Sequence, residues 1–432
     1  MNPEKKKSHG MPAWSRILLL AGLMNIFFVA ISLMGAFKEI GSGYGLVLMN
    51  ELAHNPFVGL FMGILITAVI QSSSATSSLV VGLVAGGALG DSPAEAISLA
   101  IPIIMGANIG TSVTNVIVSL AHIGRPEEFR RAFSVAIVHD FFNVIAVLVF
   151  FPLQLATDFL GKSATFVAEN LQGSGGATFE SPIKLLVSPQ KTFVTNLMTN
   201  EFAIRAVVFS AVVFILLQAL RLILSRRETG RDGPLLYVMA AALVGALFSV
   251  MDTYGHVVFH ASTATFVLAL ALLFAALVGF VNVMRSLVLD KVERIFNDFV
   301  FRNAFFGLLF GLLVTAVVQS SSVTTSIVVP LAGAGLVTIQ QVFPFTLGAN
   351  IGTTVTALLA ALASGSMAGL SVALAHLLFN VFGILLIFPF RKVPIALAEA
   401  FADLALRSRA IPIVFIVGLY LVLPFLFIFF AQ

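Results

Sequence analysis

The chain has no cysteine and few charged residues. Without cysteine it can form neither a disulfide framework nor a thiol-based catalytic site. Only 10% of its 432 residues are charged, whereas a soluble domain carries about 25%. Hydrophobic residues make up 59% of the chain. This balance excludes an ordinary soluble protein and predicts one that lies in a membrane.

The apolar residues form long runs instead of alternating with polar ones. Alternation would be expected of the strands of an outer-membrane barrel, which is therefore excluded. Five runs are about long enough to span hydrocarbon as helices: residues 17–37, 205–224, 235–251, 257–284 and 411–430. The first run is too long for the apolar core of a signal peptide and has no small-x-small cleavage site. We expect an all-α polytopic membrane protein whose N-terminus is cytoplasmic.

Three short segments occur twice, in the same order. Each copy has a Gln-Ser-Ser-Ser segment, then Gly-Ala-Asn-Ile-Gly-Thr, then a His and an Asn four residues apart. The copies are residues 67–78, 105–114 and 139–143 in the first half, and 315–326, 347–356 and 376–380 in the second. Ordered matches of this kind indicate a duplicated structural unit.

The lengths inside each unit predict an unusual helix arrangement. The apolar run 57–70 would form a helix of about 21 Å, short of the roughly 30 Å hydrocarbon core. A second short run follows the serines, so the pair predicts a re-entrant hairpin. The glycines between residues 106 and 111 predict a helix that unwinds near the midplane. The second unit predicts another hairpin over 303–336 and another broken helix over 339–362.

The basic residues give the topology. If the two hairpins enter from opposite faces, most of the 24 Lys and Arg residues lie on the cytoplasmic side, as the positive-inside rule requires. We therefore expect two inverted-topology repeats, an architecture of secondary transporters. The expected parts are an N-terminal segment with the first span (1–56), repeat 1 (57–156), an extracytoplasmic loop (157–201), linking spans with a cytoplasmic surface helix (202–302), repeat 2 (303–390), and a surface helix with the last span (391–432).

The two Gln-Ser-Ser-Ser tips are the main candidates for a binding site. They supply hydroxyls beside a helix N-terminus, whose free N–H groups favour an anion. Serines in membrane helices can also merely pack helices together or bond to their own carbonyls, but two matched clusters make that alternative weak. The predicted substrate contacts are Ser72, Ser73, Ser74, Ser320, Ser321, Ser322, Asn108 and Asn350.

The broken helices are candidates for sodium binding, because unwinding exposes carbonyl oxygens. The alternative is a glycine kink without a ligand. Asp140 stands out because an ionisable group inside a membrane suggests function, and the second unit has Leu377 in its place. The predicted sodium ligands are Gln71, Gln319, Thr111, Thr353, Ser77, Thr324 and Asp140.

Two histidines and two asparagines are assigned to structural support. His139 shares a helix face with Asn143, and His376 with Asn380. We favour interhelical hydrogen bonding for them over a direct role. None of the repeated motif segments contains Lys or Arg. An anionic substrate would thus need co-bound cations, which favours cation-coupled symport.

The paired motifs resemble those of the type II sodium-dependent inorganic phosphate cotransporters. The resemblance covers about residues 57–152 and 301–389. It implies Na⁺-driven uptake of phosphate, mainly as the divalent ion, with segments 71–74 and 319–322 as the substrate and sodium motifs. Electrogenic members carry Asp where Asp140 lies, which implies net charge movement. Residues 157–201 have no cysteine and no Asn-x-Ser/Thr acceptor, so the chain is more similar to a bacterial member.

Two other functions stay open from the residues alone. A cradle of hydroxyls and N–H groups fits sulfate or a dicarboxylate as well as phosphate. A membrane hydrolase could be built from His139 and Asp140 beside the serines, but the second unit lacks the acid. The expected partners are phosphate, Na⁺ and the lipid bilayer, with no nucleic acid, no cofactor beyond the coupling ion, and a homodimer as an option. The expected location is the inner (plasma) membrane.

Overall fold

The computed structural model is helical throughout the residues that it describes, which are 13–40, 51–171, 182–198, 268–283 and 303–430. Six of the described helices are long and apolar enough to cross a membrane. They are Trp14–Met34, Pro93–His122, Pro126–Thr157, Ile339–Ser364, Met367–Phe390 and Ala410–Phe430. The chain is thus a multi-pass membrane protein, as predicted from its composition.

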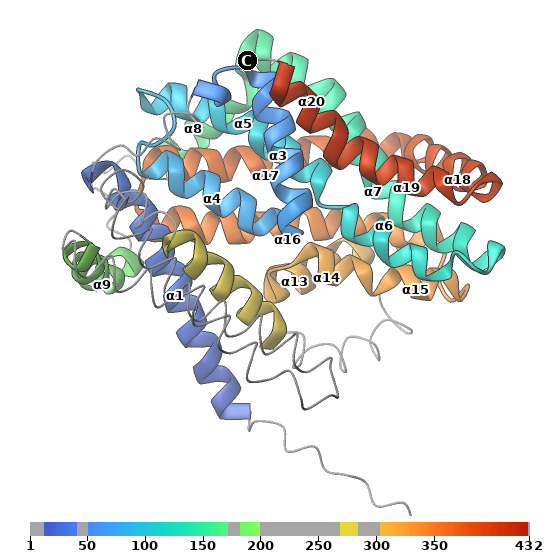
Figure 1. The fold of residues 1–432 in the computed structure, drawn as a ribbon, viewed down its shortest axis with the longest axis horizontal. Coiled ribbons are helices and arrows are strands. Elements are labelled where there is room, and N and C mark those ends of the chain that lie inside the picture. Colours follow the sequence, from blue (N-terminus) through green and yellow to red (C-terminus); the bar gives the residue numbers. More distant parts are fainter. Residues whose placement is uncertain (1–12, 41–50, 172–181, 199–267, 284–302, 431–432) are drawn as a thin grey trace, which may run out of the picture.

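Some predicted segments lie outside the described residues. They are the spans 205–224 and 235–251 and the surface helix 287–302. Of the predicted span 257–284, the structure describes the helix Leu268–Val283. Figure 1 shows this helix in yellow, below α4 and beside α1 (Ala13–Ile40).

The first repeat begins with two short helices, α3 (Pro56–Ile70) and α4 (Ser73–Ala85). At about 1.5 Å per residue, the 15-residue α3 is about 22 Å long. It ends at Gln71, whose backbone is left-handed with φ 61°. The following helices of this repeat are α5 (Pro93–Gly110), α6 (Val113–Ser119), the 3₁₀ turn Leu120–His122 and α7 (Pro126–Thr157).

The second repeat has nearly the same order of helices. Its first helix, α13 (Ala304–Val318), ends at Gln319 with φ 59°, as α3 ends at Gln71. The rest are α14 (Ser321–Ser326), α15 (Val328–Gly333), α16 (Ile339–Ser364), α17 (Met367–Ile387) and the 3₁₀ turn Phe388–Phe390. The first helices and their turns therefore match in length and geometry, whereas the single α4 of the first repeat corresponds to the two helices α14 and α15, separated at Ile327.

The two predicted helix breaks have different outcomes. In the first repeat, Gly106 and Gly110 lie inside α5, and a turn at Thr111 and Ser112 separates α5 from α6. The second is wrong, because α16 is one continuous helix. Its glycines serve close packing instead of unwinding: a Cβ on Gly348 would lie 1.8 Å from the backbone oxygen of Leu308 in α13.

The same close packing occurs in both repeats. In the first, a Cβ on Gly106 of α5 would lie 1.9 Å from the backbone oxygen of Leu60 in α3. Each repeat also packs its short helices on the other repeat. α4 lies against α16 and α17, while α14 lies against α6 and α15 against both α6 and α7. This exchange brings the two Gln-Ser-Ser-Ser segments into one central region.

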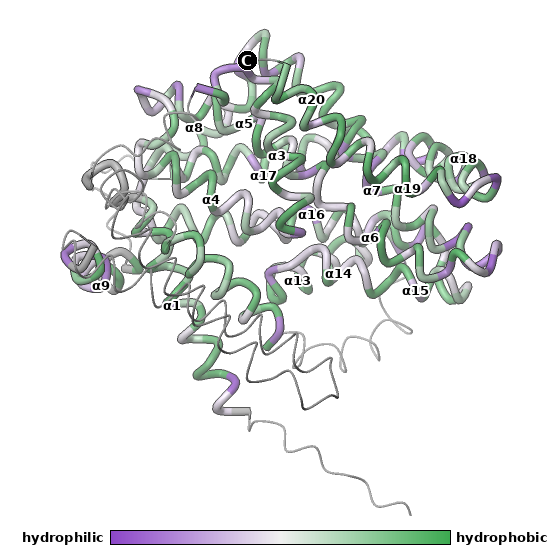
Figure 2. The backbone as a smooth tube through the Cα atoms, in the orientation of Figure 1, coloured by the Kyte–Doolittle hydropathy of each residue, from purple (hydrophilic) through white to green (hydrophobic). Residues whose placement is uncertain are grey.

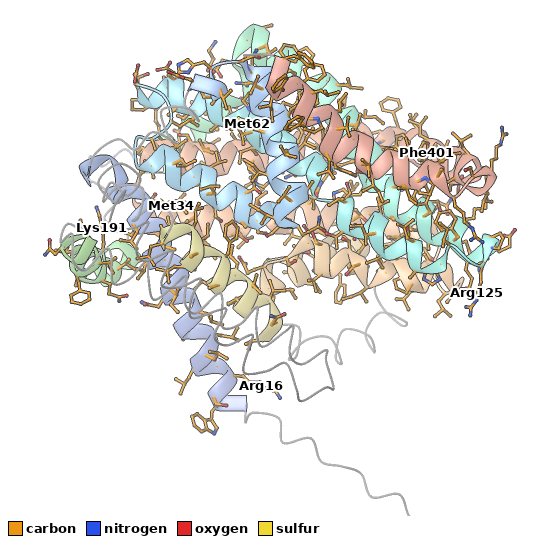
Figure 3. The ribbon with its side chains drawn as sticks, in the orientation of Figure 1. Arg16, Met34, Met62, Arg125, Lys191 and Phe401 are labelled. Carbon is orange, nitrogen blue, oxygen red and sulfur yellow. The ribbon has the colours of Figure 1, made fainter. Side chains whose placement is uncertain are left out.

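The remaining helices surround this core. The stretch 157–201, expected as a loop, contains the two helices α8 (Phe159–Leu171) and α9 (Pro182–Met198). The predicted surface helix after repeat 2 is confirmed as a helix, α18 (Lys392–Arg407), and it lies against α7. Figure 3 labels Phe401 on α18, whose ring stacks with that of Phe133 in α7 at a centroid distance of 5.9 Å.

The last span lies mostly on the outside of the molecule. It consists of α19 (Ala410–Val417), the π-helical turn Gly418–Val422 and α20 (Leu423–Phe430). Figure 2 shows hydrophobic residues along the bodies of the outer helices and hydrophilic ones gathered near turns and ends. Phe425 and Phe429 are each 60% exposed, as expected of side chains that face lipid.

Candidate functional site

The first Gln-Ser-Ser-Ser tip is held by its own hydrogen bonds. Gln71 ends α3, and its amide nitrogen donates to the backbone oxygen of Ala68. Its amide oxygen accepts a bond from the Thr114 hydroxyl of α6 at 2.8 Å. Ser72 caps α4, with its hydroxyl oxygen accepting from the Ala75 N–H at 3.2 Å. The amide and the serine hydroxyl are therefore fixed in direction.

The second tip repeats this geometry. Gln319 donates to the backbone oxygen of Ala316 and accepts from the Thr356 hydroxyl of α16 at 2.6 Å. Ser320 caps α14 by accepting from the Val323 N–H at 3.3 Å. The match extends to the threonines, because Thr114 and Thr356 hold the same place in the repeated segments.

Both tips line one cavity of about 470 Å³. Gln71 and Ser72 contribute from the first repeat, and Gln319, Ser320 and Ser322 from the second. Thr114 of α6 and the helix Leu268–Val283 form other parts of the wall. Every lining residue that the structure describes is uncharged. The cavity thus offers hydroxyl and amide groups from two distant parts of the sequence, without a fixed countercharge.

Three of the predicted substrate serines are more deeply buried. Ser73, Ser74 and Ser321 are each at most 3% exposed and do not line the cavity. The hydroxyl of Ser321 is buried and has no protein partner. The serines that line the cavity are Ser72 of the first tip and Ser320 and Ser322 of the second.

Several predicted sodium ligands bond to their own helices. The hydroxyls of Thr111 and Thr353 donate to the carbonyls four residues earlier, at 2.9 and 3.0 Å. Thr324 does the same at 2.9 Å, and Ser77 donates to the carbonyl of Ser74 at 3.2 Å. Such back-bonding occupies the hydroxyl proton and leaves oxygen lone pairs free.

The predicted asparagines lie in a buried network that joins the repeats. His139 of α7 donates from Nε2 to the amide oxygen of Asn350 in α16 at 2.6 Å. The amide nitrogen of Asn350 donates to Asn143 at 3.0 Å, and that of Asn143 to the backbone oxygen of Asn108 at 2.7 Å. His139, Asn143 and Asn350 therefore hold the repeats together, which fits the interhelical role predicted for the first two.

Asp140 lies in a separate buried cluster at the helix break. One of its carboxylate oxygens accepts bonds from the hydroxyls of Ser112 and Tyr420, and the other has no partner. The hydroxyl of Ser112 also reaches the backbone oxygen of Ile109 at 3.1 Å. Tyr420 is fully buried although most of its helix is exposed. These oxygens form a set of hard ligands suited to a cation such as Na⁺.

Sequence reasoning missed four polar residues at these places: Thr114, Thr356, Ser112 and Tyr420. The threonines ended the repeated segments, so the repeat itself was the available signal. Ser112 corresponds to Thr354 in the second repeat, so a repeated hydroxyl was the signal there. For Tyr420, the signal was a lone hydroxyl inside an otherwise apolar span.

Comparison with known proteins gives the family. The sequence profile of the Na⁺/Pi-cotransporter family matches residues 21–168 and 272–406, which together make up more than half of the chain. No solved structure gives a significant match. The matched ranges contain both tips and the buried network.

Curated relatives agree with the profile. The chain is 33% identical over 413 residues to the sodium-dependent phosphate transport protein 2B of Bos taurus, covering 87% of this chain and 58% of that protein. It is 32% identical over 442 residues to the 2A protein of Rattus norvegicus, covering 95% and 66%. It thus spans less than two thirds of the length of these relatives. The chain belongs to the Na⁺/Pi-cotransporter family.

Proposed function

We propose that this chain is a Na⁺-coupled symporter that carries inorganic phosphate into the cell by alternating access. The observation that carries the proposal is the single cavity lined by both Gln-Ser-Ser-Ser tips. Two matched tips that meet at one site are what duplicated transporter repeats build. Family membership supports the same function, since the matched relatives are named as sodium-dependent phosphate transport proteins.

The tip hydroxyls are suited to hold phosphate. Ser72 and Ser320 each accept a backbone N–H, so their own hydroxyl protons are free to donate. A phosphate dianion in the cavity would accept from these hydroxyls and from Ser322. We assign Ser73, Ser74, Ser321, Asn108 and Asn350 to a supporting layer around it.

Sodium supplies the missing positive charge. An anion enclosed by uncharged groups is poorly stabilised, and the described cavity lining has no Lys or Arg. A co-bound cation would offset the charge and make binding of the two solutes mutually dependent. We place the sodium ligands among Gln71, Gln319, Thr111, Thr353, Ser77, Thr324 and Asp140. Because Asp140 adds a site for a positive charge, transport is expected to be electrogenic.

We further propose that α3–α4 and α13–α15 are re-entrant hairpins of two inverted repeats. Their first helices, at about 22 Å, are shorter than the roughly 30 Å hydrocarbon core. The distribution of Lys and Arg over the loops supports a cytoplasmic N-terminus, and we place the chain in the inner membrane of a bacterial cell. Helices α8 and α9 would then lie on the extracytoplasmic side.

Uptake of labelled phosphate by proteoliposomes tests the function. An inward Na⁺ gradient should drive accumulation, a K⁺ gradient should not, and inward current should accompany each phosphate. Excess sulfate or succinate should leave uptake unchanged. Uptake that does not depend on Na⁺ would refute the coupling, and full competition by sulfate or succinate would refute the assignment of the cargo.

A further inference from the structure

The two repeats carry the same buried polar residues but bond them differently. The repeated segments pair three residues of the first repeat with three of the second: Asn108 with Asn350, His139 with His376, and Asn143 with Asn380. All six are at most 2% exposed. Because the matched residues have the same side chains and the same burial, we would expect the same hydrogen bonds in both repeats. The two repeats nevertheless form different ones.

One half of this set bonds across the repeat boundary, through Nε2 of His139, while its buried Nδ1 has no partner. His139 donates to Asn350 at 2.6 Å, and Asn350 donates to Asn143 at 3.0 Å. The contact joins α7 of the first repeat to α16 of the second, two helices that lie against each other. The Asn350 side chain is therefore satisfied by both repeat-1 partners.

The corresponding residues His376 and Asn380 make no such bond across the repeat boundary. Neither ring nitrogen of His376 has a partner, and the amide oxygen of Asn380 has none. The amide nitrogens of Asn380 and Asn108 bond only to carbonyls of their own helices, at 3.2 Å each. Yet α17, which carries His376, lies against α5, which carries Asn108, as α7 lies against α16. The partners for a second cross-repeat bond are on adjacent helices.

The helix backbones show the same asymmetry. The first repeat is broken at Thr111 and Ser112, between α5 and α6, whereas α16 runs unbroken through the matching residues Thr353 and Thr354. A buried polar group without a partner costs free energy. In the observed arrangement His139 has its bond across the repeat boundary, and His376 is buried without one.

We propose that the two repeats exchange these bonding patterns in the transport cycle. In the second state His376 donates to Asn108 and Asn380 bonds to the same amide, while His139 releases Asn350. His139 and His376 are then positioning residues, each stabilising one of the two access states. The inference rests on the proposed inverted-repeat transporter, because exchange between inverted repeats turns the cavity from one membrane face to the other.

The absence of cysteine from the chain provides a direct test. Asn282, an exposed residue that lines the cavity, is replaced by cysteine as a reporter. A membrane-impermeant maleimide is applied to each face of vesicles that hold oriented protein, and the ratio of the two labelling rates is measured without phosphate. The variants are His139→Leu, His376→Leu and the double variant in this background.

His139→Leu and His376→Leu should shift the ratio of the two labelling rates in opposite directions. Each shift should be about 2- to 10-fold, the range for one net hydrogen bond. The double variant should return toward the parent ratio, because neither state then has its bond. A merely structural role would give shifts of the same sign that do not cancel, and that result would overturn the proposal.

Two controls keep the test decisive. His122→Leu removes a histidine that bonds to Glu128 in its own segment and should leave the ratio unchanged. If a histidine variant does not fold, Asn350→Leu and Asn108→Leu remove the other partner of each bond and should give the same opposite shifts. The ratio is read without cargo, so failure of phosphate uptake would refute the proposed function and leave this test intact.

Discussion

The hydroxyl of Thr114 donates to the amide oxygen of Gln71 at 2.8 Å, which fixes the first tip against α6. Thr356 and Gln319 make the same contact in the second repeat at 2.6 Å. Each glutamine sits in a left-handed backbone conformation that is uncommon for a residue with a side chain. The threonines therefore hold in place the residues that shape the cavity.

Replacing either threonine by valine should weaken substrate binding without unfolding the chain. Valine keeps the shape and removes the hydroxyl, so Gln71 or Gln319 loses its fixed direction. A net hydrogen bond is worth about 0.5–1.5 kcal/mol. The phosphate concentration that gives half-maximal uptake should therefore rise about 2- to 10-fold. Concentration-dependent uptake measures this. Thr346→Val is the matched control, since the Thr346 hydroxyl bonds only to the backbone of its own helix; an equal effect there would contradict the role.

Tyr420→Phe should weaken Na⁺ dependence and leave phosphate dependence intact. The change removes one of two hydroxyls that bond to Asp140 and so removes one oxygen of the candidate cation site. The Na⁺ concentration that gives half-maximal uptake should rise about 2- to 10-fold. The phosphate concentration that gives half-maximal uptake, measured at high Na⁺, should stay the same. Phe415→Leu, which alters the ring packed against Tyr420, controls for packing. An unchanged Na⁺ curve for Tyr420→Phe would remove Tyr420 from the site.

Gly348→Ala should destabilise the fold. A Cβ at this position would meet the Leu308 backbone oxygen at 1.8 Å, and backbone cannot move aside as a flexible side chain can. Overpacking of this kind costs about 1–3 kcal/mol. Thermal unfolding in detergent should show a clear loss of Tm. Gly418→Ala, where a Cβ meets nothing within 4 Å, should leave Tm nearly unchanged.

The ion pair of Arg130 with Asp403 should contribute little to the stability of the fold, and this contribution should be lost at acidic pH. The Arg130 guanidinium holds the pKa of the Asp403 carboxyl below its ordinary value. A lowered carboxyl pKa gives stability that is present above the unfolded value of about 3.9 and is lost as pH falls through the folded one. The pair is half-exposed, so Asp403→Asn should cost less than about 1 kcal/mol at pH 7. A Tm loss that does not shrink as pH falls below about 3.9 would argue against the pair.

The sequence was most informative where residues repeat. The matched segments predicted the short helices on both sides of each tip and the glutamines and serines that meet in the cavity, but not Thr114 beside them. They could not separate the cavity-lining Ser72 from the buried Ser73, because that depends on which face of α4 meets α16. They also could not show that α16 stays continuous, since the same glycines serve either unwinding or close packing.

Other features had no local signal. The helices α8 and α9 lie in a stretch whose glycines and polar residues predicted a loop. Tyr420 reaches Asp140 across 280 residues, and a contact at that separation is set by the packing of the last span. The wall formed by the helix Leu268–Val283 likewise depends on tertiary packing, not on a motif.

The central claim is that the two tips form one substrate site, and protection from cysteine labelling tests it most directly. Ile70→Cys and Val323→Cys place reporters in the cavity beside the first and second tips, at residues outside the proposed ligands. Phe166→Cys on the exposed face of α8 is the control. Phosphate with Na⁺ should slow labelling at both tips with the same half-maximal concentration and leave the control unchanged. Protection at one tip alone, or at two different concentrations, would contradict a shared site.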